Sequence, residues 1–449
     1  MSEIIKIKKG LLIKLQGEAD RTVSEFSSSK YALKPTDFIG VFPKLNIKEG
    51  DHVKAGSPIF FDKYRDNIQF TSPVSGTITE IKRGAKRILL EVRIEADGKN
   101  EFVDFGIAAP ASLEREAVVE KLLQSGLWAT IRQRPYSTIA DPSQNPKAIF
   151  ISGFDNGPLP VDFDFVLHGK GNEFQAGLDA LAKLTKGKLH LNVHSEDTKT
   201  NVLLKAKNVE MNSFAGKFPA SLISTQIAAV DPINKGEVVW TVNVLDVITI
   251  GNLFLTGKYV ADKLIAIAGS EVIKPHYIKV KKGVCIQNLV ANNVAKENSR
   301  FISGNPLTGT RIEQNGYLGY YDNQISIIPE GDYSQFVGWI TPNLDKFSFY
   351  RSLFSWLTPK KSYRLDTNLN GGERAFVMTG QFEKVFPFEI YPLQLIKAIM
   401  SRDIDAMENL GVYEIDSEDF ALLEFISTSK IEIQSIVSDG LEFLRKEMS

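Results

Sequence analysis

Cysteine is almost absent from the chain, which has one, Cys285, among 449 residues. A single thiol cannot form an internal disulfide, hold an iron–sulfur cluster or complete a zinc ribbon. Histidine is also scarce, and the two residues that come closest to a pair, His190 and His194, lie in an expected strand. At about 3.3 Å per residue their side chains would stand roughly 13 Å apart, too far to share one ion. We therefore expect no metal site.

The chain also lacks a large net charge and long apolar runs. The chain has 53 basic and 54 acidic residues, so it lacks the positive field of nucleic-acid-binding proteins, and we expect no nucleic-acid partner. Its most apolar stretch, residues 238–255, is interrupted by Asp246 and other polar residues, so we expect no transmembrane helix. Residues 1–10 lack the apolar core of a secretory signal, which predicts a cytoplasmic protein.

The chain does have the length and the apolar residues to form several cores. With 449 residues, 43% of them hydrophobic, it predicts three or four domains in a multidomain α/β fold that is α+β overall. The expected parts are a β barrel-sandwich hybrid (biotinyl- or lipoyl-like) domain over 1–106, a Rossmann-like α/β domain over 107–257, a β-grasp (ubiquitin-like or SLBB-like) domain over 258–335 and a helical C-terminal domain over 336–449.

Local patterns support this division. Short alternating segments with Gly/Pro turns in the first part predict strands. Ser112 is expected to cap a helix that stops at Gly126. Strands and a helix then alternate in the βαβ manner, with strands over 148–151, 163–167 and 188–194 and a helix over 172–184. Near the C-terminus, Pro392 suits the first position of a helix.

Residues 49–84 are typical of a carrier domain. Their turn phrases frame the pair Asp62–Lys63 at the place where biotinyl and lipoyl domains keep a modified lysine. Six residues separate Gly56 from Lys63, whereas nine separate Lys63 from Pro73, so we expect Lys63 to lie away from the hairpin tip. We interpret the segment as a scaffold without the modification; a lysine that carries a swinging cofactor is the alternative.

A second candidate site is the sequence His-Gly-Lys-Gly-Asn at residues 168–172, between an expected strand and an expected helix. Backbone N–H groups at a helix start can bind a phosphate. The third glycine of a dinucleotide fingerprint would fall at position 174, where the chain has Phe174. We interpret this segment as a tight turn without a ligand, with nucleotide binding as the alternative.

The third candidate lies just past the expected helix end, where two aromatic residues and two arginines fall within eleven residues. These residues, Trp128, Arg132, Arg134 and Tyr136, can form a stacking and hydrogen-bonding surface for a planar ligand or a partner. In the alternative, Trp128 is buried between the first two domains and the arginines extend to solvent. Both can hold together, because pockets form at domain junctions. No Ser–His–Asp set, Walker loop or zinc-protease helix is present in the sequence, so nothing predicts a self-sufficient catalyst.

Long phrases of the chain, in order from end to end, resemble the A subunits of the sodium-translocating NADH:quinone reductase (the Nqr complex). Among them are PKLNIKEGDHVKAG, FTSPVSGTITEIKRGAKR and VDPINKGEVVWTVNVLDVITIGNLF. A more distant resemblance is to the C subunits of the Rnf electron-transport complex. The resemblance to the Nqr proteins implies a peripheral protein on the cytoplasmic side of the inner membrane. It would dock on the membrane-embedded B subunit of a complex of six subunits, which passes electrons from NADH to quinone and pumps sodium outward.

The same resemblance implies no catalytic residue and no tightly bound redox cofactor in this chain. NADH, FAD, FMN, riboflavin and the iron–sulfur centres belong to other subunits, and quinone is the substrate of the complex. If quinone touches this chain, we expect it at Trp128, Arg132, Arg134 and Tyr136. The glycine-rich flavin loop of Rnf-type relatives would fall at residues 126–137, where this chain has bulky side chains instead, which favours a cofactor-free protein. The alternative is an NADH- or flavin-binding soluble subunit of an Rnf-type complex.

Overall fold

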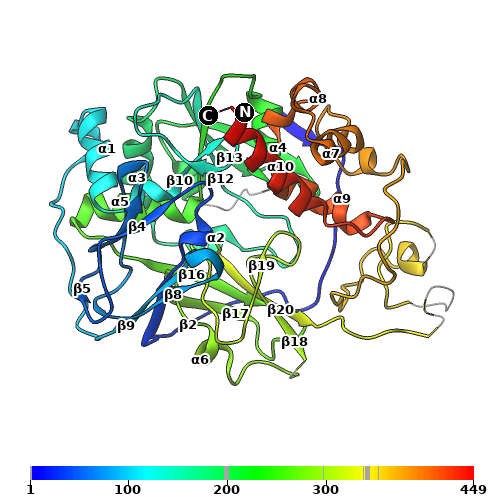
Figure 1. The fold of residues 1–449 in the computed structure, drawn as a ribbon, viewed down its shortest axis with the longest axis horizontal. Helices are drawn as coiled ribbons and strands as arrows, with labels where there is room; N and C mark the ends of the chain where they lie inside the picture. The colour runs from blue at the N-terminus through cyan, green and yellow to red at the C-terminus, as the bar shows by residue number, and fades with distance from the viewer. Residues whose placement is uncertain are drawn as a thin grey trace.

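The structure is a computed structural model that describes residues 3–196, 202–296, 298–336, 338, 344–351 and 353–448. Within these ranges the chain forms a seven-stranded sheet, a six-stranded sheet and two smaller sheets of four and three strands. The C-terminal helices, orange to red in Figure 1, lie beside the seven-stranded sheet. They share an apolar cluster with Leu159 and Phe218 of the α/β part, so this helical end is packed onto the body of the molecule.

The two smaller sheets form the barrel-sandwich part, which holds residues 30–96. One sheet has the order β3-β9-β8-β5 and the other the order β4-β6-β7. Their core is apolar and aromatic, and the rings of Phe60 and Phe70 stack with centroids 4.5 Å apart. The strands are β3 (Lys30–Leu33), β4 (Pro43–Leu45), β5 (His52–Val53), β6 (Pro58–Asp62), β7 (Arg65–Thr71), β8 (Gly76–Arg83) and β9 (Leu89–Ala96).

The expected position of Lys63 away from a hairpin tip is wrong. Lys63 is exposed and begins the two-residue turn that joins β6 to β7. Asp62 pairs with Arg65, but the preceding residue, Phe61, pairs with Gln69, so three residues of β7 have no partner in register. This irregularity absorbs the unequal arm lengths that the sequence shows. That Lys63 is unmodified stays a prediction.

The seven-stranded sheet has the order β1-β14-β13-β12-β15-β10-β11, and its first five strands are parallel. The strands are β1 (Ile4–Ile7), β10 (Ile131–Arg134), β11 (Thr138–Ile139), β12 (Ala148–Ser152), β13 (Lys188–His194), β14 (Glu210–Gly216) and β15 (Val239–Val242). Helix α4 (Ile223–Val230) packs on the face that bears Phe150. Because side chains alternate along a strand, Ile149 and Ile151 face the other side, that of α3 (Gly171–Ala182) and α5 (Val244–Thr256). The expected strands at 148–151 and 188–194 and the helix at 172–184 are confirmed.

Two local expectations are wrong. Residues 163–167, expected as a strand, form the helix α2 (Phe163–Leu167), because the Asp162 carboxylate accepts the N–H of Phe165 at 3.1 Å and caps a helical turn. Ser112 lies in the 3-10 turn η3 (Pro110–Ser112), and α1 (Arg115–Gln124) begins without a side-chain cap. The stop is confirmed, since Gly126 follows α1 in the left-handed conformation with φ +76°.

Helices α3 and α5 approach each other to backbone contact through two glycines. A Cβ atom on Gly251 would lie 1.7 Å from the carbonyl oxygen of Glu173, and one on Gly177 would lie 2.1 Å from that of Val247. No side chain fits at either position. This close crossing presses α5 into the interior, together with the one carboxylate that the helix carries, Asp246.

The six-stranded sheet has the order β19-β18-β20-β16-β17-β2, with the short helix α6 (Gln287–Val290) beside it. Its strands are β2 (Asp20–Glu25), β16 (Asp262–Ala268), β17 (His276–Lys281), β18 (Ser299–Ser303), β19 (Thr310–Ile312) and β20 (Gln324–Pro329). The N-terminal residues thus belong to other sheets than the barrel: β1 pairs with β14, and β2 pairs with β17. The four-part division at residues 106, 257 and 335 stays a prediction. Strands β1 and β2 depart from it, because they belong to sheets outside the expected first domain.

The C-terminal part is helical from residue 392 onward. Its helices are α7 (Pro392–Ser401), α8 (Ile404–Asn409), α9 (Ala421–Ile426) and α10 (Ile433–Glu447). Pro392 is the first residue of α7, as expected. Gly440 of α10 packs against Ile399 of α7 so closely that a Cβ atom would lie 2.3 Å from the Ile399 side chain. None of the helices in the described ranges has the length and apolarity needed to cross a bilayer.

Candidate functional site at a domain junction

Trp128 lies inside the protein, on the 3-10 turn η4 (Leu127–Thr130) that precedes β10. Its side chain is fully buried, and its Nε1–H donates to the carbonyl oxygen of Ala140 at 2.8 Å. The indole ring meets that of Trp240 edge to face, with centroids 5.4 Å apart. In this structure Trp128 therefore supports its neighbours and offers no surface to a ligand.

Arg134, at the end of β10, is also buried, and it joins the sheet to the C-terminal part. Its guanidinium group forms ion pairs with Asp416 and Glu418, the latter at 3.0 Å. The Ser137 hydroxyl donates to the Asp416 carboxylate at 2.6 Å. The guanidinium group is thus held between two carboxylates and does not extend to solvent. The alternative in which Arg132 and Arg134 both extend to solvent therefore does not hold for Arg134.

Two buried carboxyl groups near Arg134 have pKa values shifted in opposite directions. Burial opposes the charge on Asp416, but the charge of Arg134 outweighs it and holds the pKa of Asp416 below its usual value. Burial, reinforced by the charge of Glu418, raises the pKa of Asp419 well above its usual value. Asp416 and Asp419 also cap each other at the start of η9 (Ser417–Phe420). The cluster thus places the Arg134 cation against Asp416 and Glu418.

Tyr136 stands in the turn between β10 and β11 in the left-handed conformation, with φ +78°. Its ring lies against Tyr413 of the C-terminal part, with centroids 6.3 Å apart. Burial raises the pKa of the Tyr136 hydroxyl. Tyr136 and Arg134 therefore both point to the C-terminal part.

Of the four predicted residues, Arg132 is the one that lies near a pocket. Its guanidinium group lies over the ring of Tyr321, 4.8 Å from the centroid, and the Tyr321 hydroxyl donates to the carbonyl oxygen of Ala129 at 2.7 Å. The adjacent Tyr320 ring is 5.1 Å from that of Tyr321 and lines the pocket. The structure therefore divides the four candidates. Arg132 stacks on Tyr321, next to a residue that lines the pocket, whereas Arg134 and Tyr136 contact the C-terminal part and Trp128 is buried in the core.

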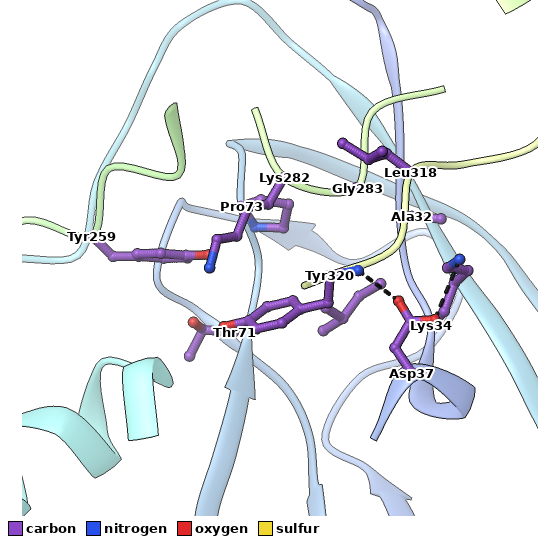
Figure 2. Close-up of a pocket in the computed structure, with 11 residues that line it drawn as sticks. Ala32, Lys34, Asp37, Thr71, Pro73, Tyr259, Lys282, Gly283, Leu318 and Tyr320 are labelled. Atoms are coloured by element: carbon purple, nitrogen blue, oxygen red, sulfur yellow. Dashed lines mark hydrogen bonds and ion pairs between the residues drawn. The ribbon is translucent and has the colours of Figure 1, made fainter. Parts of the chain in front are cut away.

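The pocket lies where the barrel meets the six-stranded sheet and the end of α5. Figure 2 shows its lining, which consists of Ala32, Leu33, Lys34, Asp37, Thr71, Pro73, Tyr259, Lys282, Gly283, Leu318 and Tyr320. It is narrow: only about 10 Å³ is open to the centre of a water molecule, roughly what one water requires. A small polar atom therefore fits, and a whole ring does not.

A buried ion pair lies at the pocket. The Lys282 ammonium contacts a carboxylate oxygen of Asp246 at 2.6 Å, and the two side chains are 3% and 1% exposed. The other Asp246 oxygen, Oδ2, has no hydrogen-bond partner among the described residues. The Lys282 ammonium also lies over the Tyr320 ring, 4.2 Å from its centroid, and in Figure 2 it projects between Tyr259 and Tyr320. The Lys282 cation and the phenol groups of Tyr259 and Tyr320 thus lie together in a buried part of the molecule.

On the barrel side, Asp37 of the 3-10 turn η1 (Pro35–Asp37) holds the backbone of Tyr320 in place. Its carboxylate accepts the backbone N–H of Tyr320 at 2.8 Å and lies 3.3 Å from the Lys34 ammonium. Burial raises the pKa of Asp37, and Lys34 opposes this shift. The donors that line the pocket are the Lys282 ammonium and the hydroxyls of Tyr259 and Tyr320, and such donors in a buried site suit an oxygen atom that gains negative charge.

Lys263 is a second buried lysine near this site. Its ammonium donates to the carbonyl oxygen of Asp322 at 2.7 Å. Burial lowers its pKa to about 8, against the opposing charge of Asp246. The folded protein thus loses this proton at a lower pH than the unfolded chain, where lysine titrates near 10.5.

This difference predicts a pH-dependent stability. Between about pH 8 and 10.5 the unfolded chain binds more protons than the folded one, so Lys263 makes stability rise with pH in that window. From about pH 7.5 to 9.5 we expect wild type to gain about 1–2 kcal/mol relative to Lys263→Met. Urea unfolding at both pH values measures this difference. Equal pH responses of the two proteins would contradict the buried, pKa-shifted state of Lys263.

Sequence reasoning missed the pocket residues Asp37, Lys282 and Tyr320. They lie in separate parts of the chain, and no local pattern joins them. One signal was present: Asp246 is the one charged residue in the apolar stretch 238–255, and a lone carboxylate in an interior helix requires a partner.

The segment at residues 168–172 shows no feature of a phosphate site. It follows the helix α2 rather than the expected strand, and Gly169 takes φ +78° in the turn. A Cβ atom on Gly169 or Gly171 would meet nothing within 4 Å, so neither glycine serves a close approach within the chain. The described residues also contain no group of three or more His, Cys, Asp or Glu side chains arranged for a metal ion.

The fold and the site together define a class of protein: a multidomain α/β chain with a barrel-sandwich hybrid at its start and a polar pocket at its domain junction. Family models agree. They match residues 5–97 as the NqrA N-terminal barrel-sandwich hybrid domain, residues 113–259 as the NqrA second alpha/beta domain and residues 264–314 as the NQRA C-terminal domain. The expected fold class is thereby confirmed.

Relatives that match from end to end lead to the same family. The A subunit of the Na(+)-translocating NADH-quinone reductase of Neisseria meningitidis serogroup B (strain MC58) is 36% identical over 99% of this chain and 100% of its own. The protein of the same name from Marinomonas sp. (strain MWYL1) is 35% identical over 98% of this chain and 99% of its own. The chain therefore belongs to the NqrA family, the A subunits of the Na(+)-translocating NADH-quinone reductase, as the resemblance indicated.

A solved structure gives a much weaker match. The NAD+-reducing [NiFe]-hydrogenase in the air-oxidized state aligns with a TM-score of 0.37 and 13% identity, over 73% of this chain and 60% of its own. A match at this level carries no argument about the fold or the site.

Proposed function

We propose that this chain is a peripheral subunit of a sodium-translocating NADH:quinone oxidoreductase. It docks on the membrane-embedded B subunit on the cytoplasmic side and takes part in electron transfer from NADH to quinone without a redox cofactor of its own. The observation that carries this proposal is the identity of 35–36% to NqrA proteins over essentially the whole chain.

The segment where an Rnf-type relative would have its flavin loop supports the cofactor-free part of the proposal. A Cβ atom on Gly126 would lie 2.4 Å from the Thr71 hydroxyl oxygen of the barrel, and that hydroxyl donates to the carbonyl oxygen of Ser125 at 2.8 Å. Trp128 follows in the core. The segment is thus closed by its own packing against the barrel, and a flavin phosphate would have to displace it.

We further propose that the junction pocket contributes to the quinone site. A quinone carbonyl oxygen is about the size of a water molecule, so it fits the narrow space beside Lys282 while the ring stays at the mouth. Reduction places negative charge on that oxygen, and the Lys282 ammonium and the tyrosine hydroxyls can stabilise it. Arg132, stacked on Tyr321, would then approach the ring or its substituents from the sheet side.

Removal of one pocket hydroxyl tests this proposal. In the purified complex, Tyr320→Phe is expected to lower kcat/KM for quinone about tenfold, the value of one hydrogen bond worth about 1.4 kcal/mol. NADH oxidation by an artificial acceptor that bypasses quinone should not change.

The matched control is Tyr317→Phe, which removes a buried hydroxyl three residues away that does not line the pocket. Its quinone kinetics are expected to equal those of wild type. Unchanged quinone kinetics in Tyr320→Phe, or an equal loss in both variants, would exclude the pocket as part of the quinone site.

A further inference from the structure

A group of exposed apolar side chains lies in the segment that connects the six-stranded sheet to the C-terminal helices. They belong to the 3-10 turn η6 (Phe354–Leu357) and to the chain beside it. Phe354 is 43% exposed, Trp356 53%, Leu357 56% and Leu344 58%. In Figure 1 this yellow segment lies at the right-hand edge of the molecule, away from the barrel strands β5, β8 and β9. We call these four residues the η6 patch.

Hydrogen bonds hold the two arms of the η6 patch together. The Ser348 N–H donates to the Ser355 hydroxyl oxygen at 3.1 Å, and the Ser355 hydroxyl donates back to the carbonyl oxygen of Ser348 at 3.1 Å. The Lys361 ammonium donates to the carbonyl oxygen of Leu344 at 2.9 Å, which places the fourth patch residue next to the turn. The exposed apolar side chains thus project from a closed loop with its own polar supports.

The η6 patch is also anchored to the folded body. The Tyr350 hydroxyl donates to the carbonyl oxygen of Ile426 in α9 at 3.0 Å. Tyr363 is buried, and its backbone N–H donates to the carbonyl oxygen of Lys14 at 2.8 Å. The patch therefore has a fixed orientation relative to the rest of the molecule.

Charge around the η6 patch is strongly positive, although the whole chain has a net charge of −1. Residues 344–364 contain one acidic residue, Asp345, and five basic ones: Lys346, Arg351, Lys360, Lys361 and Arg364. Arg351 and Lys360 are exposed, and the Arg351 guanidinium lies over the Trp356 ring, 5.6 Å from its centroid. Lys361 is paired with Asp345 and Arg364 with Glu271, so the excess positive charge beside the aromatic and aliphatic side chains comes from Lys346, Arg351 and Lys360.

We propose that the η6 patch binds the surface of an anionic lipid bilayer directly. Tryptophan prefers the boundary between headgroups and acyl chains, and exposed Phe and Leu side chains insert there. Basic residues next to such an anchor are attracted to anionic headgroups. Protein interfaces are likewise enriched in Trp, Phe and Arg, but their centres are depleted in lysine, so the lysines beside the η6 patch favour the lipid surface. The proposal adds a lipid contact to the docking proposed above and does not depend on the quinone pocket.

Vesicle flotation of the purified full chain tests this inference. We expect the wild type to float with vesicles of phosphatidylcholine and phosphatidylglycerol, and to do so weakly with phosphatidylcholine alone. The double variant Trp356→Ser/Leu357→Ser should bind anionic vesicles at least about tenfold more weakly, because it removes the apolar anchor. The charge variant Arg351→Glu/Lys360→Glu should also lose at least about tenfold.

Matched controls lie on other parts of the surface. Ile273→Ser removes an apolar side chain that is 55% exposed, and Lys48→Glu reverses an exposed charge on the barrel. Both should bind vesicles like the wild type. A second readout is fluorescence quenching by brominated lipid in a Trp339→Phe background, which should fall when Trp356→Phe is added, because Trp128 and Trp240 are fully buried.

Three results would overturn the inference. The wild type does not float with anionic vesicles, or the controls lose as much binding as the patch variants, or the patch variants keep full binding. If the wild type does not bind vesicles and Trp356→Ser/Leu357→Ser does not co-purify with the membrane subunits, the η6 patch contacts protein and not lipid.

Discussion

Replacement of Asp246 by leucine is expected to lower the free energy of unfolding by about 3–5 kcal/mol. The substitution leaves the Lys282 ammonium, 3% exposed, without its counter-charge 2.6 Å away. A buried charge without a partner loses its hydration and gains nothing in return, so the folded state is destabilised. The shift of the unfolding midpoint in urea, measured on the purified chain, gives the size of the effect.

The double variant Asp246→Leu/Lys282→Met is the control for this prediction. It removes both charges and keeps most of the buried volume, so it should recover most of the lost stability. In the complex it should still have impaired quinone kinetics, because the pocket loses its cation. If Asp246→Leu is as stable as the wild type, or the double variant is no more stable than the single one, the pair is not the buried contact described here.

Arg134→Met is expected to have a comparable effect, about 3–5 kcal/mol at neutral pH, because it leaves Asp416 and Glu418 without their shared cation. The effect should depend on pH. The pKa of Asp416 is held below its usual value, so its ion pair stabilises the fold above the ordinary carboxyl range and is lost as the pH falls through the lowered pKa. The difference between variant and wild type should therefore shrink below about pH 4. Thermal midpoints at neutral and acid pH measure it.

Arg132→Met is the matched control for this variant. It lies two residues earlier on the same strand, is only half-buried and stacks on Tyr321 without a salt bridge of its own in the described contacts. We expect a loss of at most about 1 kcal/mol. Equal losses in the two variants, or a loss in Arg134→Met that does not change with pH, would contradict the role of Arg134 as the link to the C-terminal helices.

Local patterns predicted the elements whose signals are local. Pro392 begins α7 and Gly126 follows the end of α1, because each residue fits a backbone conformation that neighbouring residues determine. Alternation misled at residues 163–167, since the capping carboxylate of Asp162 favours a helix there. The position of Lys63 depended on an irregular pairing of β6 and β7 that residue counts do not show. The placement of β1 and β2 in distant sheets is likewise a tertiary property.

The candidate site was predicted only in part, for the same reason. A position of residues 128–136 at a domain junction was one interpretation of the sequence. In the structure, residues 131–134 form β10 within the seven-stranded sheet, and Gly126 just before the segment packs on Thr71 of the barrel. The sequence did not indicate that Arg134 pairs with Asp416, 282 residues away, or that Lys282 pairs with Asp246, 36 residues away. Pairing of buried charges depends on tertiary packing, so a single sequence shows the charges without their partners.

The central claim is that this chain shapes a quinone-reducing complex while other subunits carry the electrons. The absorbance spectrum of the purified full chain, before and after addition of dithionite, tests that claim most directly. We expect protein absorbance in the ultraviolet alone, with no visible band and no change on reduction. A visible band that bleaches on reduction and stays with the chain through purification would contradict it.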